Sequence, residues 1–164
     1  MVNRARLIIL AALCVPVVII ASAVVIYDLE PVASSPNAHF TTFTVSDKTY
    51  KFTSVATNQT ELAKGLMGAK VTSTTFELFV FPTSGYYSFW MYDVNSSLDI
   101  MWLNTSPGSD SGSFVYLALD VPPCHVSVLC ATYQPSAKAN YVIEAQAGFA
   151  TAAGIKVGTP VTLG

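Results

Sequence analysis

The chain has 164 residues, of which only 11% are charged, well below the roughly 25% typical of soluble domains. The part after residue 26 carries six scattered lysines and ten carboxylates, which gives it a net charge of −4. Because nucleic-acid binding depends on clustered basic side chains that neutralise phosphates, this composition argues against a nucleic-acid partner.

An uncharged, strongly apolar segment runs from Leu7 to Ile26, with Arg4 and Arg6 before it. Twenty residues at a helical rise of about 1.5 Å cover roughly 30 Å, the thickness of the hydrocarbon core of a bilayer. Cationic residues stay preferentially on the cytoplasmic side, so the two arginines place the N-terminus inside and residues 27–164 outside. We therefore predict a single-pass protein of the cell membrane that contacts the lipid bilayer through residues 7–26.

A cleaved signal peptide is the alternative to this anchor. Met1–Arg6 would be its basic region, Leu7–Ile20 its apolar core and Ala21–Ala23 its small-residue cleavage site, and the domain would then be secreted. The apolar character continues through Ile26, beyond the expected cut, which favours a retained anchor. Residues 1–26 are thus predicted to be a transmembrane anchor or signal peptide, and the proline-containing residues 27–38 a tether.

Residues 39–164 are predicted to form one domain, because their number suits a single hydrophobic core. Segments rich in β-branched and aromatic residues predict strands at 39–45, 49–55, 76–81, 86–91, 99–103, 114–119 and 141–146. A polar cap at Asn58 or Thr60, followed by apolar residues at helical spacing, predicts a short helix over Asn58–Met67, and Phe149–Ala153 suggests a second helical turn. Short strands separated by turn signals are typical of a mainly β fold, here a compact β-sandwich or barrel-like domain with one or two short helices.

Cys124 and Cys130 are the cysteines that follow the apolar segment. An oxidising compartment favours a disulfide between them. The alternative is a copper or zinc site in which His125 joins both thiolates, but it needs a fourth ligand that the sequence does not offer. We therefore expect a disulfide, no bound metal and no cofactor.

Three Asn-x-Ser/Thr sequons, at Asn58, Asn95 and Asn104, are candidate glycosylation sites for an extracytoplasmic domain. No Gly-x-Ser-x-Gly motif occurs, and neither histidine has an evident catalytic partner in the sequence. No residue is therefore predicted to be catalytic.

Aromatic residues gather in the segment that contains Trp90 and Tyr92. In a strand, alternate residues face the same side, so these two aromatic side chains share one face. If this face is exposed, it forms a groove that binds a ligand, whereas packing in the core is the alternative. The candidate ligand-binding residues are Trp90, Tyr92, Asp93, Asp99 and Lys64.

Several short motifs occur together in an order that resembles family 192 of the domains of unknown function, over roughly residues 40–163. The motifs are Lys64-Gly65-Leu66-Met67, Phe89-Trp90-Met91, Leu98-Asp99-Ile100, Pro123-Cys124 with Cys130 and Tyr133, Tyr141-Val142-Ile143-Glu144, Ala147-Gly148, and Ile155 with Gly158. The resemblance implies a compact, mostly β domain that is often exported or membrane-tethered, and it implies no particular activity. The family commonly has a Lys-Asn pair and a proline where this chain has Tyr92-Asp93 and Ser97, so a cationic contact there is lost or reversed.

These observations favour a membrane-anchored extracytoplasmic module that binds a small ligand or a neighbouring envelope or membrane protein. One alternative is an enzyme that acts on envelope glycans through Asp93, Asp99 or Glu144, which would need two carboxylates around one cavity. The other is a structural subunit of a membrane complex that docks through its apolar helix.

Overall fold

The computed structural model describes residues 39–164. The predicted membrane or signal helix and the tether lie outside the described residues. Among residues 39–164, no helix combines the length and the hydropathy needed to cross a membrane.

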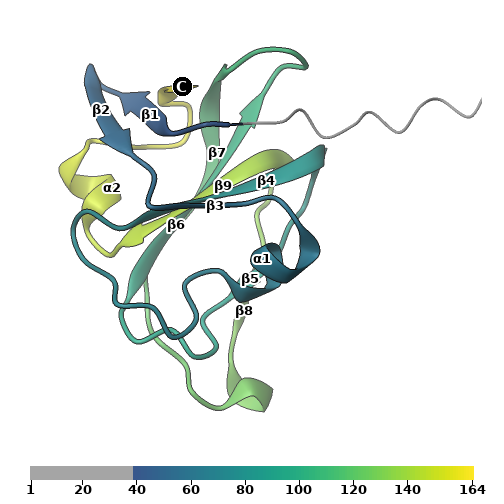
Figure 1. Ribbon diagram of the computed structural model, residues 1–164, viewed down its shortest axis with the longest axis vertical. Helices are drawn as coiled ribbons and strands as arrows, with labels where there is room; N and C mark the ends of the chain where they lie inside the picture. The colour runs from purple at the N-terminus through teal and green to yellow at the C-terminus, as the bar shows by residue number, and fades with distance from the viewer. Residues whose placement is uncertain (1–38) are drawn as a thin grey trace, which may run out of the picture. The chain divides into compact units, whose positions relative to one another are not determined.

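Eight strands form one mixed sheet in the linear order β2-β1-β10-β7-β6-β9-β4-β3 (Figure 1). In chain order they are β1 (Thr42–Val45), β2 (Lys48–Lys51), β3 (Ser54–Ala56), β4 (Phe76–Gly85), β6 (Leu98–Thr105), β7 (Ser111–Val121), β9 (Ala139–Gln146) and β10 (Pro160–Leu163). Neighbouring strands are antiparallel except β3 and β4, which are parallel. The short strands β5 (Phe89–Trp90) and β8 (Thr132–Tyr133) pair as a separate antiparallel ribbon.

The prediction of a mainly β fold with two short helices is confirmed. The eight strands belong to one large sheet, however, and not to the two facing sheets of a sandwich. The central strands are covered on both faces, because Leu78 and Met101 pack in one buried cluster while Phe79 and Trp102 pack in a second. A strand that is buried on both sides has a nearly continuous apolar sequence, which is the pattern of 76–81 and 99–103 apart from Glu77 and Asp99.

The helix α1 (Gln59–Lys64) begins where the sequence predicts. Asn58 is its N-cap, and its side chain accepts a hydrogen bond from the backbone N–H of Glu61 at 3.0 Å. In return, the side chain of Glu61 accepts a hydrogen bond from the backbone N–H of Asn58. The helix ends before the predicted Met67 because Gly65 leaves the helical conformation with φ +47°. The second helix, α2 (Phe149–Ala152), occupies the predicted helical turn.

The predicted strand 49–55 is divided into β2 and β3. Phe52, between the two strands, is buried and stacks on Phe43 of β1 with ring centroids 5.1 Å apart. The next residue, Thr53, donates its backbone N–H to the carbonyl of Phe76 at 2.8 Å. The chain therefore passes at this point from the β1–β2 end of the sheet to the opposite end, where β3 pairs with β4 and is followed by α1.

Candidate ligand-binding site

Two glutamates lie directly opposite each other in the sheet. Glu77 of β4 pairs in register with Glu144 of β9. Residues opposed in this way have Cβ atoms about 4.5 to 5.5 Å apart and point to the same face. Only 6% of Glu77 and 3% of Glu144 is exposed to solvent, so two carboxyl groups share a buried environment.

The surroundings of Glu144 do not compensate a negative charge. Its Oε2 atom is buried and has no hydrogen-bond partner. Burial first, and the neighbouring charge of Glu77 second, raise the pKa of Glu144 from 4.5 to about 8, while the backbone amide of Leu66 acts in the opposite direction. Glu144 is therefore mostly protonated at neutral pH.

Glu77 lies in a more mixed environment, although its Oε2 atom also lacks a hydrogen-bond partner. Burial raises the pKa of Glu77 to about 7, and the charge of Glu61 adds to this rise. The hydroxyl of Ser54 and the ammonium group of Lys64 lower the same pKa. At pH 7 the pair of glutamates therefore carries fewer than two negative charges.

The segment Lys64–Met67, which we call the covering segment, lies over this pair. A Cβ atom added at Gly65 would lie 3.0 Å from Cζ of Phe79 and 3.4 Å from Oε2 of Glu144. The positive φ of Gly65 also disfavours an L side chain. The glycine therefore lets the backbone approach the carboxyl of Glu144 closely.

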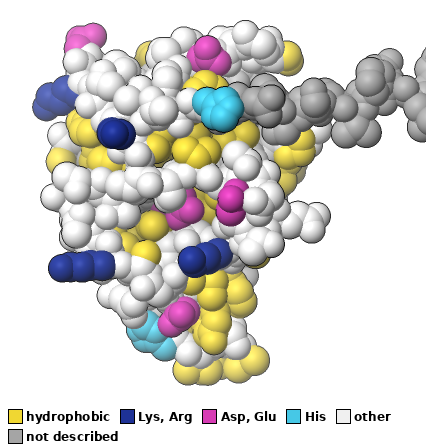
Figure 2. Space-filling model, viewed as in Figure 1, with side chains coloured by type: hydrophobic (Ala, Val, Ile, Leu, Met, Phe, Trp, Pro, Cys, Tyr) yellow, Lys and Arg dark blue, Asp and Glu magenta, His cyan; other side chains and the backbone are white. Residues whose placement is uncertain are grey.

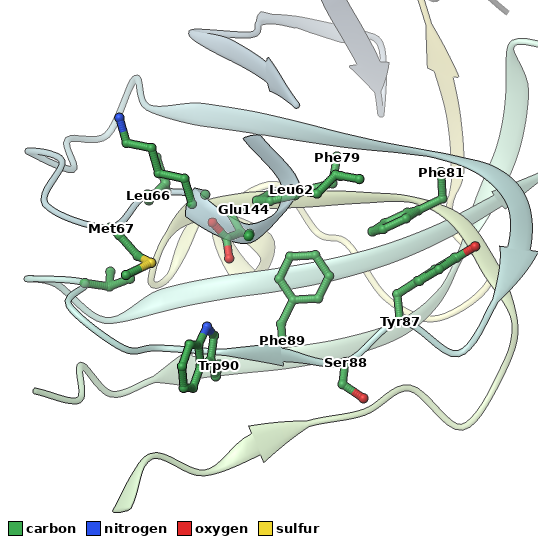
Figure 3. A pocket seen from close by; sticks show the side chains of 14 residues that line it. Leu62, Leu66, Met67, Phe79, Phe81, Tyr87, Ser88, Phe89, Trp90 and Glu144 are labelled. Atoms are coloured by element: carbon green, nitrogen blue, oxygen red, sulfur yellow. The ribbon is translucent and has the colours of Figure 1, made fainter. Parts of the chain in front are cut away.

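A cavity of about 270 Å³ opens beside Glu144 (Figure 3). The carboxyl group of Glu144 points into the space between Met67, Phe89 and Trp90. The lining is mostly apolar and aromatic, and it comprises Leu62, Ala63, Lys64, Gly65, Leu66, Met67, Phe79, Phe81, Tyr87, Ser88, Phe89, Trp90, Val94 and Glu144. We call this space the Glu144 cavity.

Aromatic rings stiffen one wall of the Glu144 cavity. Phe81 and Tyr87 stack with ring centroids 3.6 Å apart, and Phe89 meets Phe79 edge-to-face at 4.8 Å. In addition, the indole N–H of Trp102 donates a hydrogen bond to the backbone carbonyl of Tyr87 at 2.8 Å. This wall is therefore preformed, because the packing of these rings and the hydrogen bond from Trp102 hold the loop between β4 and β5.

A second cavity, of about 420 Å³, lies on the Glu77 side of the covering segment. It is lined by Ser54, Val55, Glu61, Lys64, Gly65, Leu66, Met67, Gly68, Ala69 and Glu77. In the space-filling view, acidic and basic side chains lie near apolar ones on the face that carries α1 and β3 (Figure 2). The covering segment thus separates two cavities, each with one of the paired carboxyl groups in its wall.

The structure brings four of the five predicted binding residues to this region. Lys64 and Trp90 line the Glu144 cavity, and 43% of Trp90 is exposed. The ring of Tyr92 lies 5.3 Å from that of Trp90. The carbonyl of Asp93 accepts a hydrogen bond from the backbone N–H of Gly68, just after the covering segment, at 2.8 Å.

Asp99 is not brought together with these residues. It is only 1% exposed, and it lies opposite Ala145, so it points to the other face of the sheet from Glu144. Its two carboxylate oxygens accept hydrogen bonds from the backbone N–H groups of Asp120 at 3.0 Å and Ala150 at 2.9 Å. Asp99 therefore joins β6, the end of β7 and α2, and it is not available to a ligand in the Glu144 cavity.

A disulfide joins Cys124 and Cys130, whose Cα atoms are 5.6 Å apart. The loop that it closes protrudes from the domain and exposes 54% of Val126, 89% of Val128 and 77% of Leu129 (Figure 1). Across residues 39–164, no three His, Cys, Asp or Glu side chains lie close enough together to hold a metal ion.

The three sequons differ in how their asparagine side chains are used. Asn95 is exposed in the segment before β6. Asn58 caps α1, and the side chain of Asn104 accepts a hydrogen bond from the hydroxyl of Ser84 at 2.7 Å. Both hydrogen bonds are accepted by the amide oxygen Oδ1, whereas a glycan is attached to Nδ2, so neither bond excludes glycosylation.

Glu77, as a residue of the site, and its pairing with Glu144 were not predicted from the sequence. A signal for both residues is present, because each is a single charged residue inside an otherwise apolar strand. A charge in a strand that is buried on both faces needs a partner or a function. The pairing itself depends on the strand order, which places β4 beside β9 although the two strands are far apart in the chain.

A larger groove, of about 830 Å³, lies elsewhere on the domain and has His39, the first described residue, on its rim. Its carboxylate, Asp110, is exposed, and its amide, Asn140, already donates to the hydroxyl of Thr105 at 3.0 Å. The polar groups of this groove are thus solvated or paired, unlike those beside the covering segment.

Residues 41–163 match the family DUF192, described as "Uncharacterized ACR, COG1430", and the chain belongs to this family. No curated protein matches the chain.

Two solved structures have a similar fold. One is a protein of unknown function from Novosphingobium aromaticivorans DSM 12444, with 24% identity and a TM-score of 0.59 over 73% of this chain and 81% of that one. The other, from Sinorhizobium meliloti 1021, is described as "a putative transcription regulator" and has 21% identity and a TM-score of 0.61 over 74% of this chain and 90% of that one. At these identities the likeness shows the fold alone.

Proposed function

We propose that the protein is a membrane-anchored extracytoplasmic binding module that holds a small ligand in the Glu144 cavity. The observation that carries this proposal is the carboxyl group of Glu144, which is buried, points into an apolar, aromatic space and has one oxygen atom, Oε2, without a hydrogen-bond partner. A buried polar atom without a partner costs free energy, and a ligand that bonds to it recovers that cost.

The size and lining of the cavity restrict the ligand. Typical ligand pockets have volumes of roughly 300 to 1,000 Å³ and combine apolar walls with a few polar groups that set orientation. The Glu144 cavity, at about 270 Å³, lies just below this range, so the ligand or the part of it that enters is compact. The rings of Phe89 and Trp90 favour a flat apolar body beside the carboxyl group.

The membrane-anchored and extracytoplasmic part of the proposal is supported by the sequence. The apolar residues 7–26 follow two arginines, which is the pattern of an anchor with its N-terminus inside. The pairing of Cys124 with Cys130 suits an oxidising compartment outside the cytoplasm.

The glycan-acting alternative on Asp93, Asp99 and Glu144 has no geometric support. It requires two of these carboxyl groups around one cavity. Asp99 points to the opposite face of the sheet from Glu144 and is bonded to backbone N–H groups, while Asp93 lines neither cavity beside the covering segment.

The test uses the full chain in lipid nanodiscs with benzamide, a compact neutral aromatic amide, as the probe. We expect saturable shifts in the amide NMR signals of the covering segment and of Phe89. Trp90→Ala should weaken binding about tenfold, equivalent to about 1.4 kcal/mol, without unfolding the domain. Tyr86→Ala is the matched control, because Tyr86 is an exposed aromatic residue that does not line the cavity.

Two results would count against the binding proposal. Benzamide, benzamidine and benzoate could all leave the signals of the covering segment unchanged up to their solubility limits. Alternatively, Trp90→Ala could lower the melting temperature while binding stays the same, which would make Trp90 a packing residue.

A further inference from the structure

The chemistry of the Glu144 cavity also defines the charge of its ligand. We infer that the cavity binds an organic cation whose N–H groups donate to Glu144 while its apolar body lies against Phe89 and Trp90. This inference rests on the proposed function and adds the ligand class to it.

The first argument is the surplus of acidic groups around the cavity. Glu77 and Glu144 face each other inside the domain, and both present an Oε2 atom without a partner. The charged groups packed against them come from α1, which contributes Glu61 and Lys64. Lys64 lines both cavities but is exposed, and its charge acts on Glu77 and not on Glu144, so a cation to pair with Glu144 is left for a ligand to supply.

The second argument is the aromatic lining. Phe81, Tyr87, Phe89 and Trp90 all line the cavity, and aromatic faces attract cations through the negative potential above the ring. A carboxylate beside aromatic faces is a favourable environment for an ammonium, amidinium or guanidinium group attached to an apolar body.

The third argument excludes a metal ion as the occupant. Calcium takes roughly six to eight oxygen ligands and magnesium requires a nearly octahedral oxygen set. The Glu144 cavity offers one carboxyl group among apolar side chains, and in the described part of the chain no three potential ligands lie together. An organic cation needs fewer oxygen contacts, because its apolar body is bound by the walls.

Binding of a cation should displace a proton. Without ligand, Glu144 has a pKa of about 8 and is mostly protonated at neutral pH. A cation in contact with the carboxyl group stabilises its ionised form and lowers this pKa. One proton therefore leaves Glu144 for the solvent as the cation enters, and the net charge of the site changes little.

The experiment is calorimetric titration of the full chain in nanodiscs with three probes of nearly the same shape: benzamidine, benzamide and benzoate. At about pH 7 we expect benzamidine to bind at least about tenfold more tightly than benzamide, and benzoate to bind most weakly. The heat of benzamidine binding should differ between phosphate and Tris buffers, because the released proton is taken up by the buffer.

Glu144→Gln should remove both the preference for benzamidine and the proton release, while Asp110→Asn, an exposed carboxylate away from the cavity, should keep both. Equal binding of benzamidine and benzamide would overturn the inference and leave the proposed function intact. A preference that survives Glu144→Gln would overturn it too, and a failure of all three probes to bind would overturn both.

If Glu144→Gln folds poorly, Glu77→Gln provides the second test. It removes the like charge that helps to keep Glu144 protonated. Proton release at about pH 7 should therefore decrease, while the preference for benzamidine remains. Loss of the preference for benzamidine in this variant would overturn the inference, because it would place the cation at Glu77 and not at Glu144.

Discussion

Glu144 and Glu77 should make the stability of the fold depend on pH. Their folded-state pKa values, about 8 and about 7, lie above the unfolded value of 4.5. The folded state therefore holds protons that the unfolded chain loses, and the stabilisation is complete below pH 4.5 and is lost as the pH rises through these two values. The slope is about 1.4 kcal/mol per pH unit for each proton retained by the folded state.

Urea denaturation followed through the fluorescence of the buried Trp102 measures this dependence. The free energy of unfolding should fall between about pH 5 and about pH 8. In Glu144→Gln the free energy of unfolding should fall less steeply with pH, whereas in Asp110→Asn it should fall as in the wild type. A wild-type stability that stays constant over this interval would show that the carboxyl pair is ionised in the folded state.

Asp99 has a structural role, and its substitution separates that role from ligand binding. Asp99→Ala leaves the buried N–H group of Ala150 and the N–H group of Asp120 without their acceptor. We expect a loss of roughly 3 kcal/mol of stability, since each unpaired buried group costs about 1 to 3 kcal/mol. Asp99→Asn should cost less, because one acceptor oxygen remains. Thermal unfolding measures both losses, and benzamide binding to the folded fraction should be unchanged.

The covering segment depends on a glycine that can approach both Phe79 and Glu144. Gly65→Ala places a methyl group 3.0 Å from Cζ of Phe79 and strains a backbone with φ +47°. Gly108→Ala is the control, because Gly108 also has a positive φ but has nothing within 4 Å of an added Cβ. Both changes should cost about 1 to 2 kcal/mol of stability, because each places an L side chain on a backbone with positive φ. Only Gly65→Ala should also weaken benzamide binding in NMR titrations, and equal effects on binding would contradict this account.

The loop closed by Cys124 and Cys130 should unfold locally when its disulfide is removed. For so short a loop, the chain-entropy relation gives about 2 to 2.5 kcal/mol. Replacing both cysteines with alanine should raise amide hydrogen exchange in the loop and at the Tyr92–Cys124 bridge, while the central strands stay protected. Loss of protection in β6 and β9 would show that the loop stabilises the whole sheet.

Local sequence signals predicted elements well where one residue determines the backbone. Asn58, one of the two predicted caps, is the N-cap of α1, and Gly65 ends the helix earlier than the apolar spacing alone indicates. The division of 49–55 into two strands was not predictable in this way. Phe52 and its neighbours have the composition of one strand, and the break is caused by packing of Phe52 on Phe43, a contact between segments whose relative placement depends on the fold.

At the scale of the domain, the site is a product of strand order. The sequence shows Trp90 and Lys64 as candidate binding residues, and both line the Glu144 cavity. The pairing of Glu77 with Glu144 arises because β4 and β9 are neighbours in a mixed sheet, and the placement of Asp99 on the other face follows from the register of β6. Such long-range pairings involve strands separated by tens of residues, so local composition cannot reveal them.

The proposed membrane anchor makes the orientation of the chain a prediction, because the binding proposal requires residues 27–164 to lie outside the cytoplasm. A reporter enzyme that is active only outside the cytoplasm, fused after Gly164, should be active if residues 27–164 are exported as the arginines predict. Moving the positive charge, by replacing Arg4 and Arg6 with glutamate and adding lysines after residue 26, should reduce that activity. The matched control adds the same number of serines after residue 26. An inactive reporter in the unmodified chain would place the domain in the reducing cytoplasm, where the pairing of Cys124 with Cys130 would not persist.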